Sequence, residues 1–161
     1  MFSLELRLLG RGSLEARLTA LDQEASVLAS FLSDAPAELA SAVLLLLEGA
    51  SSARCAWQDE PGEYRWLFER EADLLRLTLR AFPDNYSRQD DRHGVLLFQS
   101  EDRLRRFASR LRQELHYFLV TIGADGYERH WGHPFPTREY QRLEHWLSGP
   151  PRNAPPGASA K

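Results

Sequence analysis

Cross-linking and membrane-anchoring features are scarce in this chain. A single cysteine, Cys55, occurs among 161 residues, so no internal disulfide can form, which agrees with a reducing compartment. No apolar run approaches the roughly 18 residues that a membrane span requires. The N-terminus also lacks the basic segment and continuous apolar core of a secretory signal. We therefore predict a cytoplasmic protein that does not enter membranes.

Signatures of catalysis are also lacking. No serine lies in a G-x-S-x-G turn, and Gly10 and Gly12 form a turn pair without the following helix that a phosphate site needs. Cys55 falls among apolar residues of a predicted strand, where burial raises the pKa of a thiol and makes it inert. We therefore predict a protein that is not an enzyme and carries no cofactor.

Lysine is nearly absent, because nineteen of the twenty basic residues are arginine and the other is Lys161. This bias is typical of a GC-rich bacterial coding sequence. The net charge is −3, so the molecule as a whole has no general attraction for nucleic acid or for an anionic membrane. With 43% hydrophobic and 27% charged residues, the composition is typical of a globular domain.

Strand patterns, followed by a helix pattern, occupy the first third of the chain. Residues 3–8 and 14–19 alternate apolar and polar side chains around a Gly-x-Gly turn, which predicts a hairpin, and residues 23–32 predict a third strand. Asp34 is a candidate cap for a helix that continues to about Glu48. A run of four leucines makes this helix apolar over most of its circumference, which predicts burial.

The stretch WQDEPGEYRWLF, Trp57 to Phe68, predicts a second hairpin. Glu60-Pro61-Gly62-Glu63 suits a type II turn, because proline fixes φ at the second position and glycine accepts a positive φ at the third. The register that follows makes one face of the hairpin almost wholly apolar, so we expect its aromatic residues in the core. The predicted pairs are Trp57 with Tyr64, Cys55 with Trp66, and Ala53 with Phe68.

Two more strands and two helices complete the pattern. Strands at 75–80 and 94–99 extend the hairpin into a meander. Residues 100–122 place apolar side chains three and four apart, which predicts a long amphipathic helix. A linker, YERHWGHPFP, then precedes a short helix over 137–147.

This order of elements predicts the α+β class. We expect a mainly antiparallel sheet, made of an N-terminal hairpin and a central meander, with the buried helix, the long amphipathic helix and the short C-terminal helix packed on one face. One domain covers residues 1–148, a size that buries a proper core. Residues 149–161 are polar and rich in proline, and we predict that this tail is disordered.

Histidines and arginines offer two candidate sites. His130 and His133 have an H-x-x-H spacing that could serve a metal-dependent hydrolase, although zinc needs three or four ligands and the pair lies in the linker. The long helix carries basic residues that could bind nucleic acid weakly, or an acidic protein, although no aromatic side chain is interleaved for stacking on bases. These basic residues are Arg103, Arg105, Arg106, Arg110 and Arg112.

Carboxylates mark a third candidate surface. The turn at 59–62 and the loop PDNYSRQDDRH at 83–93 are separated by two strands, so both emerge at the same end of a meander. Loops on a rigid sheet commonly carry binding, and an acidic rim would steer a cationic partner. We predict such a protein-binding surface, against the alternative of a merely solvated rim. Its residues are Asp59, Glu60, Glu63, Asp84, Asp90 and Asp91.

Four runs of sequence carry a resemblance to a known group. They are SFLSDAPAELASAVLLLLEGA, WQDEPGEYRWLFER, LLFQSEDRLRRFASRLRQEL and HWGHPFPTREYQRL. Over most of residues 3–147 the chain resembles a group of small, uncharacterised bacterial α+β proteins that are suspected to be immunity proteins of toxin systems. The specific parts of the likeness are Asp59 to Trp66 and His133 to Pro136. The resemblance implies a toxin-neutralising, protein-binding domain, whose cationic partner would be a basic, nuclease-type toxin, and it supplies no catalytic residues to carry over.

Overall fold

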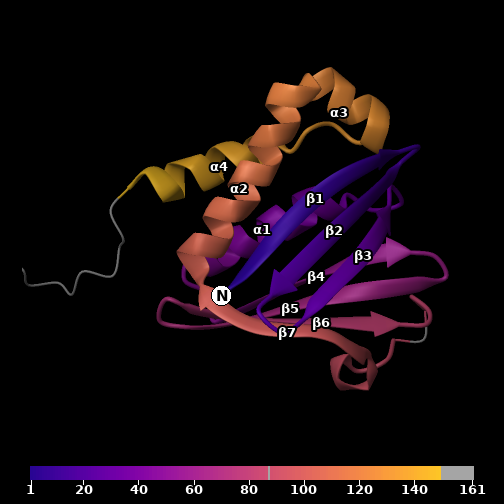
Figure 1. The fold of residues 1–161 in the computed structure, drawn as a ribbon, viewed down its shortest axis with the longest axis vertical. Helices are drawn as coiled ribbons and strands as arrows, with labels where there is room; N and C mark the ends of the chain where they lie inside the picture. The colour runs from indigo at the N-terminus through magenta and orange to yellow at the C-terminus, as the bar shows by residue number, and fades with distance from the viewer. Residues whose placement is uncertain (87, 150–161) are drawn as a thin grey trace, which may run out of the picture.

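The strands form two antiparallel sheets, each a simple meander (Figure 1). The computed structural model describes residues 1–86 and 88–149, and in this part of the chain no ladder of hydrogen bonds joins the two sheets. The predicted α+β class is confirmed, but the single sheet is corrected to two, because a helix carries the chain from the third strand to the fourth. Sheet A contains β1 (Phe2–Gly10), β2 (Ser13–Ala20) and β3 (Glu24–Ser30), and sheet B contains β4 (Ser52–Asp59), β5 (Gly62–Glu71), β6 (Leu74–Phe82) and β7 (Val95–Arg103).

Four α-helices in the described residues gather at one side of the sheets (Figure 1). The buried helix α1 packs against β4 and α4, and the long helix α2 packs against β1, α3 and α4. None of the helices in this part of the chain combines the length and the apolar character needed to cross a membrane. The predicted tail, 149–161, lies outside the described residues except for Gly149. The helices are α1 (Ala35–Leu47), α2 (Leu104–Thr121), α3 (Gly123–Trp131) and α4 (Thr137–Ser148), and a short 3-10 helix, η1 (Asp91–His93), precedes β7.

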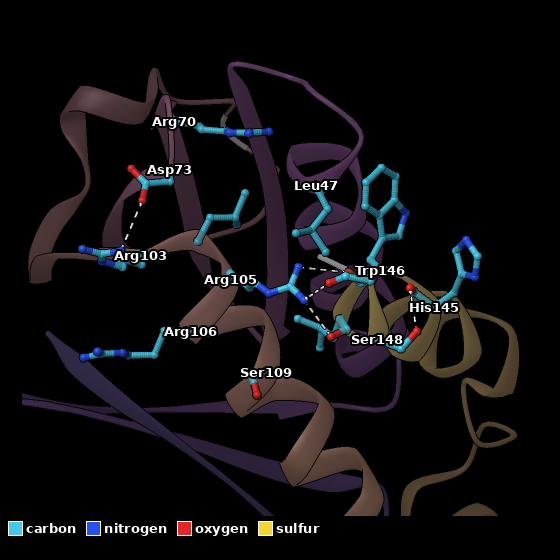
Figure 2. Close-up of a pocket in the computed structure, with 13 residues that line it drawn as sticks. Leu47, Arg70, Asp73, Arg103, Arg105, Arg106, Ser109, His145, Trp146 and Ser148 are labelled. Atoms are coloured by element: carbon cyan, nitrogen blue, oxygen red, sulfur yellow. Dashed lines mark hydrogen bonds and ion pairs between the residues drawn. The ribbon is translucent and has the colours of Figure 1, made fainter. Parts of the chain in front are cut away.

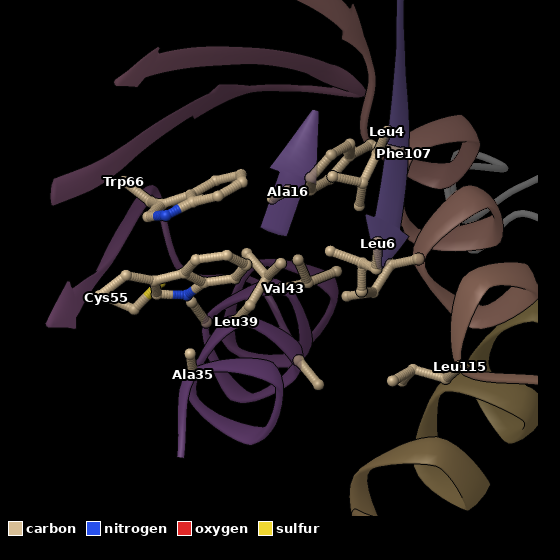
Figure 3. Close-up of a cluster of buried hydrophobic side chains, with 14 of the residues drawn as sticks. Leu4, Leu6, Ala16, Ala35, Leu39, Val43, Cys55, Trp66, Phe107 and Leu115 are labelled. Atoms are coloured by element: carbon tan, nitrogen blue, oxygen red, sulfur yellow. The ribbon is translucent and has the colours of Figure 1, made fainter. Parts of the chain in front are cut away.

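One hydrophobic core connects both sheets to the helices. Alternation along each strand sends every second side chain inward. Figure 3 shows Leu4 and Leu6 of sheet A, Val43 of α1, Trp66 of sheet B and Phe107 of α2 converging on this core. Each large apolar side chain contributes about 1.5–3 kcal/mol when fully buried, so shared packing holds the two sheets together.

The predicted register of the second hairpin is confirmed. Trp57, Trp66 and Phe68 are buried and Tyr64 is half-buried. The aromatic residues of WQDEPGEYRWLF therefore belong to the core and do not form a solvent-facing platform. The observed pairs are Trp57 with Tyr64, Cys55 with Trp66, and Ala53 with Phe68.

The turn of this hairpin is not the predicted type II turn. Between the paired residues Asp59 and Gly62 lie Glu60 and Pro61, joined by a cis peptide bond, so proline takes the third position, as in type VI turns. Gly62 has no positive φ. Glycine is needed there for space, because a Cβ at this position would lie 2.7 Å from the carbonyl oxygen of Phe82.

The long helix begins later than the sequence predicts. Residues 100–103 continue β7, where Glu101 pairs with Arg76 and Asp102 pairs with Leu75. Asp102 is buried, and its carboxylate accepts a hydrogen bond from the main-chain N–H of Phe2 at 3.2 Å. Pairing with β6 and contact with β1 therefore override the local helix signal.

The first half of the predicted linker before the last helix, residues 127–131, belongs to a helix, α3. Gly123 has a φ of +70°, a conformation that ends α2 and lets α3 begin in a new direction. Tyr127 and Trp131, four residues apart, are fully buried, and Trp131 Nε1 donates to Asp34 Oδ1 at 3.0 Å. The spacing of these two aromatic residues was a helix signal that the linker prediction missed.

Candidate functional site

One end of sheet B brings the two predicted acidic loops together. The β4–β5 turn and the β6–β7 loop both emerge there, as the meander predicted. Asn85 Nδ2 donates to Gln58 Oε1 at 2.9 Å, so the two loops are joined directly. We call this region, residues 58–63 with 83–86 and 88–94, the loop end.

A buried arginine holds the loop end together. Arg65 projects from the outer face of β5, yet it is only 7% exposed. Its guanidinium donates to Glu63 at 2.9 Å, to Asp91 at 2.9 Å and to the Gln89 carbonyl at 2.6 Å. Its Cζ also lies 3.7 Å from the centroid of the Phe82 ring. Charge-assisted hydrogen bonds are short and strong, so Arg65 pins the β6–β7 loop to the sheet.

Two of the six predicted acids are turned inward. Glu63 is 8% exposed and forms an ion pair with Arg65 at 2.8 Å. Asp91 bridges Arg65, at 2.9 Å, and Arg54, at 2.8 Å. Each of these carboxylates is paired with a guanidinium of the protein itself, Glu63 in a buried position and Asp91 with its side chain 32% exposed, because a buried guanidinium needs an anionic partner. Glu63 and Asp91 therefore stabilise the loop end from within, which limits what they can offer a partner.

The other four acids lie on the outside of the loop end. Glu60 and Asp90 are exposed, and Asp59 and Asp84 are partly exposed. Asp90 accepts hydrogen bonds from the main-chain N–H and the Nε–H of Arg92, at 3.0 and 3.1 Å. The side-chain hydrogen bond from Arg92 is the main reason that the pKa of Asp90 is lowered to about 2. Asp90 therefore stays ionised at any pH that the folded protein is expected to meet.

An exposed tyrosine at the loop end was missed by the sequence reasoning. Tyr86 is 77% exposed, although its main-chain N–H donates to Asp84 Oδ1 at 3.2 Å. The side chain of Arg92 is 85% exposed. Tyrosine and arginine are among the residues that most often dominate protein–protein binding energy. The signal was visible in PDNYSRQDDRH, where the tyrosine has no apolar neighbours with which it could enter a core.

The basic residues predicted on the long helix do not form one continuous face. Arg103 belongs to β7, while Arg105 reaches to the end of α4 and donates to main-chain carbonyls there. Arg110 Nε donates to the Leu4 carbonyl at 2.8 Å and so covers part of the free edge of β1. The row is divided among different neighbours, so it lacks the unbroken basic stripe that tracks a nucleic-acid backbone.

A cavity of about 720 Å³ lies at the opposite end of sheet B (Figure 2). The β5–β6 turn, the start of α2 and the end of α4 enclose it. We call it the arginine pocket. Its lining comes from elements far apart in the sequence, which is why no local pattern predicted it. Its charged and titratable lining residues are Arg70, Asp73, Arg103, Arg105, Arg106 and His145.

The H-x-x-H histidines and the cysteine lie in structural positions. The carbonyl of His130, in α3, accepts from Gly12 N–H at 3.0 Å, and His133 Nε2 donates to the Phe31 carbonyl at 2.6 Å. Within residues 1–86 and 88–149, no group of three or more His, Cys, Asp or Glu side chains is arranged to hold a metal ion. Cys55 is buried, and this desolvation raises the pKa of its thiol.

Comparisons with known proteins assign no role to the loop end or to the arginine pocket. No protein-family model matches the chain, and no curated protein matches it. Among solved structures, the fold is similar to a chain of the CdiA-CT/CdiI toxin and immunity complex from Enterobacter cloacae. The TM-score is 0.46 at 12% sequence identity, over 72% of this chain and 99% of that chain. A likeness at this TM-score carries no argument about function.

Proposed function

We propose that this protein is a non-enzymatic protein-binding domain that contacts its partner through the loop end. The observation that carries the proposal is the anchoring of the second half of the β6–β7 loop, residues 89–94, to the sheet. Arg65 ties this loop to the sheet at Gln89 and Asp91, and Arg80 Nη1 donates to the Gly94 carbonyl at 2.9 Å. A loop that is ordered before binding loses less conformational entropy in a complex, which favours affinity.

The exposed groups of the loop end favour a cationic protein. Tyr86 supplies an aromatic contact that the protein itself does not bury. The outward-facing carboxylates of Asp59, Glu60, Asp84 and Asp90 outnumber the exposed guanidinium groups of Arg88 and Arg92 by four to two. The surplus of negative charge would speed the encounter with a basic surface more than it would tighten the final complex.

A toxin-neutralising role is the more specific form of this proposal. It rests on the resemblance of the sequence to suspected immunity proteins, and the loop end is where such a toxin would bind. An immunity protein needs only to occupy a surface of its toxin, so a preformed loop with an aromatic contact is sufficient.

A photo-crosslinking amino acid at position 86 tests the proposal in native host cells. We expect one crosslinked protein from this position and none from the matched control position Gln141, an exposed residue of α4. With the captured protein purified, Tyr86→Ala should weaken binding by about 30-fold or more, the range of an interface hot spot. Crosslinks from position 141 but not from position 86 would place the binding surface elsewhere.

Two further measurements separate steering from recognition and test the toxin-neutralising role. Glu60→Gln with Asp90→Asn should slow association at low salt while leaving the dissociation rate nearly unchanged. Expression of the captured protein alone should arrest growth, and co-expression of this domain should restore it. If the captured protein is harmless when expressed alone, the protein-binding role proposed for this domain stands and its toxin-neutralising role does not.

A further inference from the structure

The described lining of the arginine pocket holds more arginines than acids (Figure 2). Among the described residues, four arginines line it and Asp73 is the one acid in the lining. Behind the lining, Arg106 Nε lies 3.8 Å from the carboxylate of buried Asp102. Arg103 approaches Asp73 at 3.7 Å, a long and exposed contact. Exposed ion pairs at such distances contribute about 0–1 kcal/mol, so this contact leaves Arg103 available to another anion.

Two of the four arginines are bonded to neutral groups. Arg105 donates to the carbonyls of Trp146, Leu147 and Gly149 at 3.2, 2.7 and 2.6 Å. Arg70 donates to the Ala72 carbonyl at 2.6 Å, and also to a carbonyl at the end of α1. A carbonyl satisfies a guanidinium hydrogen bond but carries no compensating charge. Both arginines are therefore held rigidly while their positive charge still acts on the pocket.

The first turn of α2 adds to the same field. Leu104 and the two arginines that follow it line the pocket, and no side chain caps this helix end. The Leu104 N–H is satisfied by the Asp73 carbonyl at 2.9 Å. The positive end of the helix dipole reinforces an anion site that the arginines already define.

Apolar side chains complete the walls. Leu47, Leu104 and Leu147 line the pocket together with Trp146. The volume of about 720 Å³ falls within the roughly 300–1,000 Å³ range of small-molecule sites. The lining therefore suits a molecule that has both an anionic group and an apolar body.

We propose that the arginine pocket binds a small phosphate monoester whose organic part is apolar or aromatic. Phosphate fits better than a single carboxylate because it is close to a dianion at neutral pH and offers three acceptor oxygens. Several guanidinium groups can then bind it at once, in the bidentate geometry that arginine favours. The site is independent of the loop end, since it lies at the other end of sheet B.

Isothermal titration with phenyl phosphate at low ionic strength tests this proposal. We expect saturable one-to-one binding of phenyl phosphate. Inorganic phosphate lacks the apolar ring and benzoate lacks the phosphate group, so each should bind about tenfold more weakly or worse. Equal affinity for inorganic phosphate would overturn the role of the apolar walls. Equal affinity for benzoate would overturn the preference for phosphate.

Variants locate the binding. Arg103→Gln with Arg106→Gln should weaken phenyl phosphate binding by about tenfold or more. Arg129→Gln with Arg138→Gln removes the same charge from exposed positions outside the pocket and should change the affinity less than about twofold. Asp73→Asn should strengthen binding, since it removes the one acid in the lining.

Three outcomes would overturn the site. They are no binding of phenyl phosphate at millimolar concentration, an equal loss of binding in the two double variants, and weaker binding in Asp73→Asn. Far-ultraviolet circular dichroism of each variant establishes that a loss of binding is not a loss of fold.

Discussion

The two ends of sheet B use arginine in opposite ways. At the loop end, Arg65 meets the carboxylates of Glu63 and Asp91. At the arginine pocket, Arg105 and Arg70 meet main-chain carbonyls. A carboxylate cancels the charge of a guanidinium, whereas a carbonyl only satisfies its hydrogen bonds. One end is therefore closed by short ion pairs around a buried arginine, and the other has more arginines than acids in its described lining, with only the long contacts of Arg103 and Arg106 to acids.

This difference separates stability from binding. An arginine that pairs with carboxylates of the same chain stabilises the loop that it holds. Another protein would then bind the outer side of that loop. An arginine held by carbonyls is fixed in place yet keeps its charge for a ligand. The comparison predicts that substitutions at the two ends differ in size and in character.

The largest effect is expected for Arg65→Met. The change leaves Glu63 buried without its cation, which costs about 3–5 kcal/mol of unfolding free energy. Urea unfolding monitored by tryptophan fluorescence measures it. The double variant Glu63→Met with Arg65→Met removes the stranded charge and should recover most of the loss. A single variant within about 1 kcal/mol of the original protein would show that the pair is hydrated and that the contrast between the ends is false.

A smaller loss is expected for Arg105→Met in the arginine pocket. Three carbonyls at the end of α4 lose a charged donor, which costs about 1.5–3 kcal/mol. Water in the cavity can reach those carbonyls, so the loss should be smaller than for Arg65. Urea unfolding gives the energy, and hydrogen exchange should show faster exchange confined to the last turn of α4. Arg105→Lys should fall between the two, because one ammonium cannot span all three carbonyls. An Arg105→Met variant that loses more than Arg65→Met would reverse the comparison.

The smallest effect concerns the pH dependence of the exposed pair at the loop end. The pKa of Asp90 is lowered from 3.8 to about 2, chiefly by its hydrogen bond from Arg92. Its contribution to stability is therefore present above pH 3.8 and is lost as the pH falls towards 2. A carboxyl carbon titration by NMR should give a midpoint for Asp90 near 2, and Arg92→Gln should raise that midpoint, although the hydrogen bond from the main-chain N–H of residue 92 remains. An unchanged midpoint in Arg92→Gln would show that this pairing does not control the charge.

The strands were predictable because their evidence is local and repeated. Alternating side chains fix which face of a strand is buried, and a two-residue turn then fixes which residues oppose each other. The pairing of Cys55 with Trp66 follows from these two facts alone. The helix start was not predictable in this way. Glu101 and Asp102 are typical of a first helical turn, but pairing with β6 and a hydrogen bond to Phe2 keep them extended.

The candidate sites were predictable only in part. Meander topology predicted that the two acidic loops share one end of sheet B, because two strand reversals return the chain to the same edge. It did not predict that Glu63 would be buried, since this depends on a long loop folding back over Arg65. No local sequence pattern predicts the arginine pocket, because Arg70 and Arg105 line the same cavity only when α2 packs beside the β5–β6 turn.

By itself, the sequence determined the α+β class, the antiparallel pairing within each hairpin, the faces that enter the core and the end at which the polar loops emerge. These properties depend on the spacing of apolar residues over a few positions. Only the tertiary structure decided which charges are neutralised and which remain available. The charge that a guanidinium presents depends on whether its neighbour is a carboxylate or a carbonyl, and those neighbours lie far away along the chain.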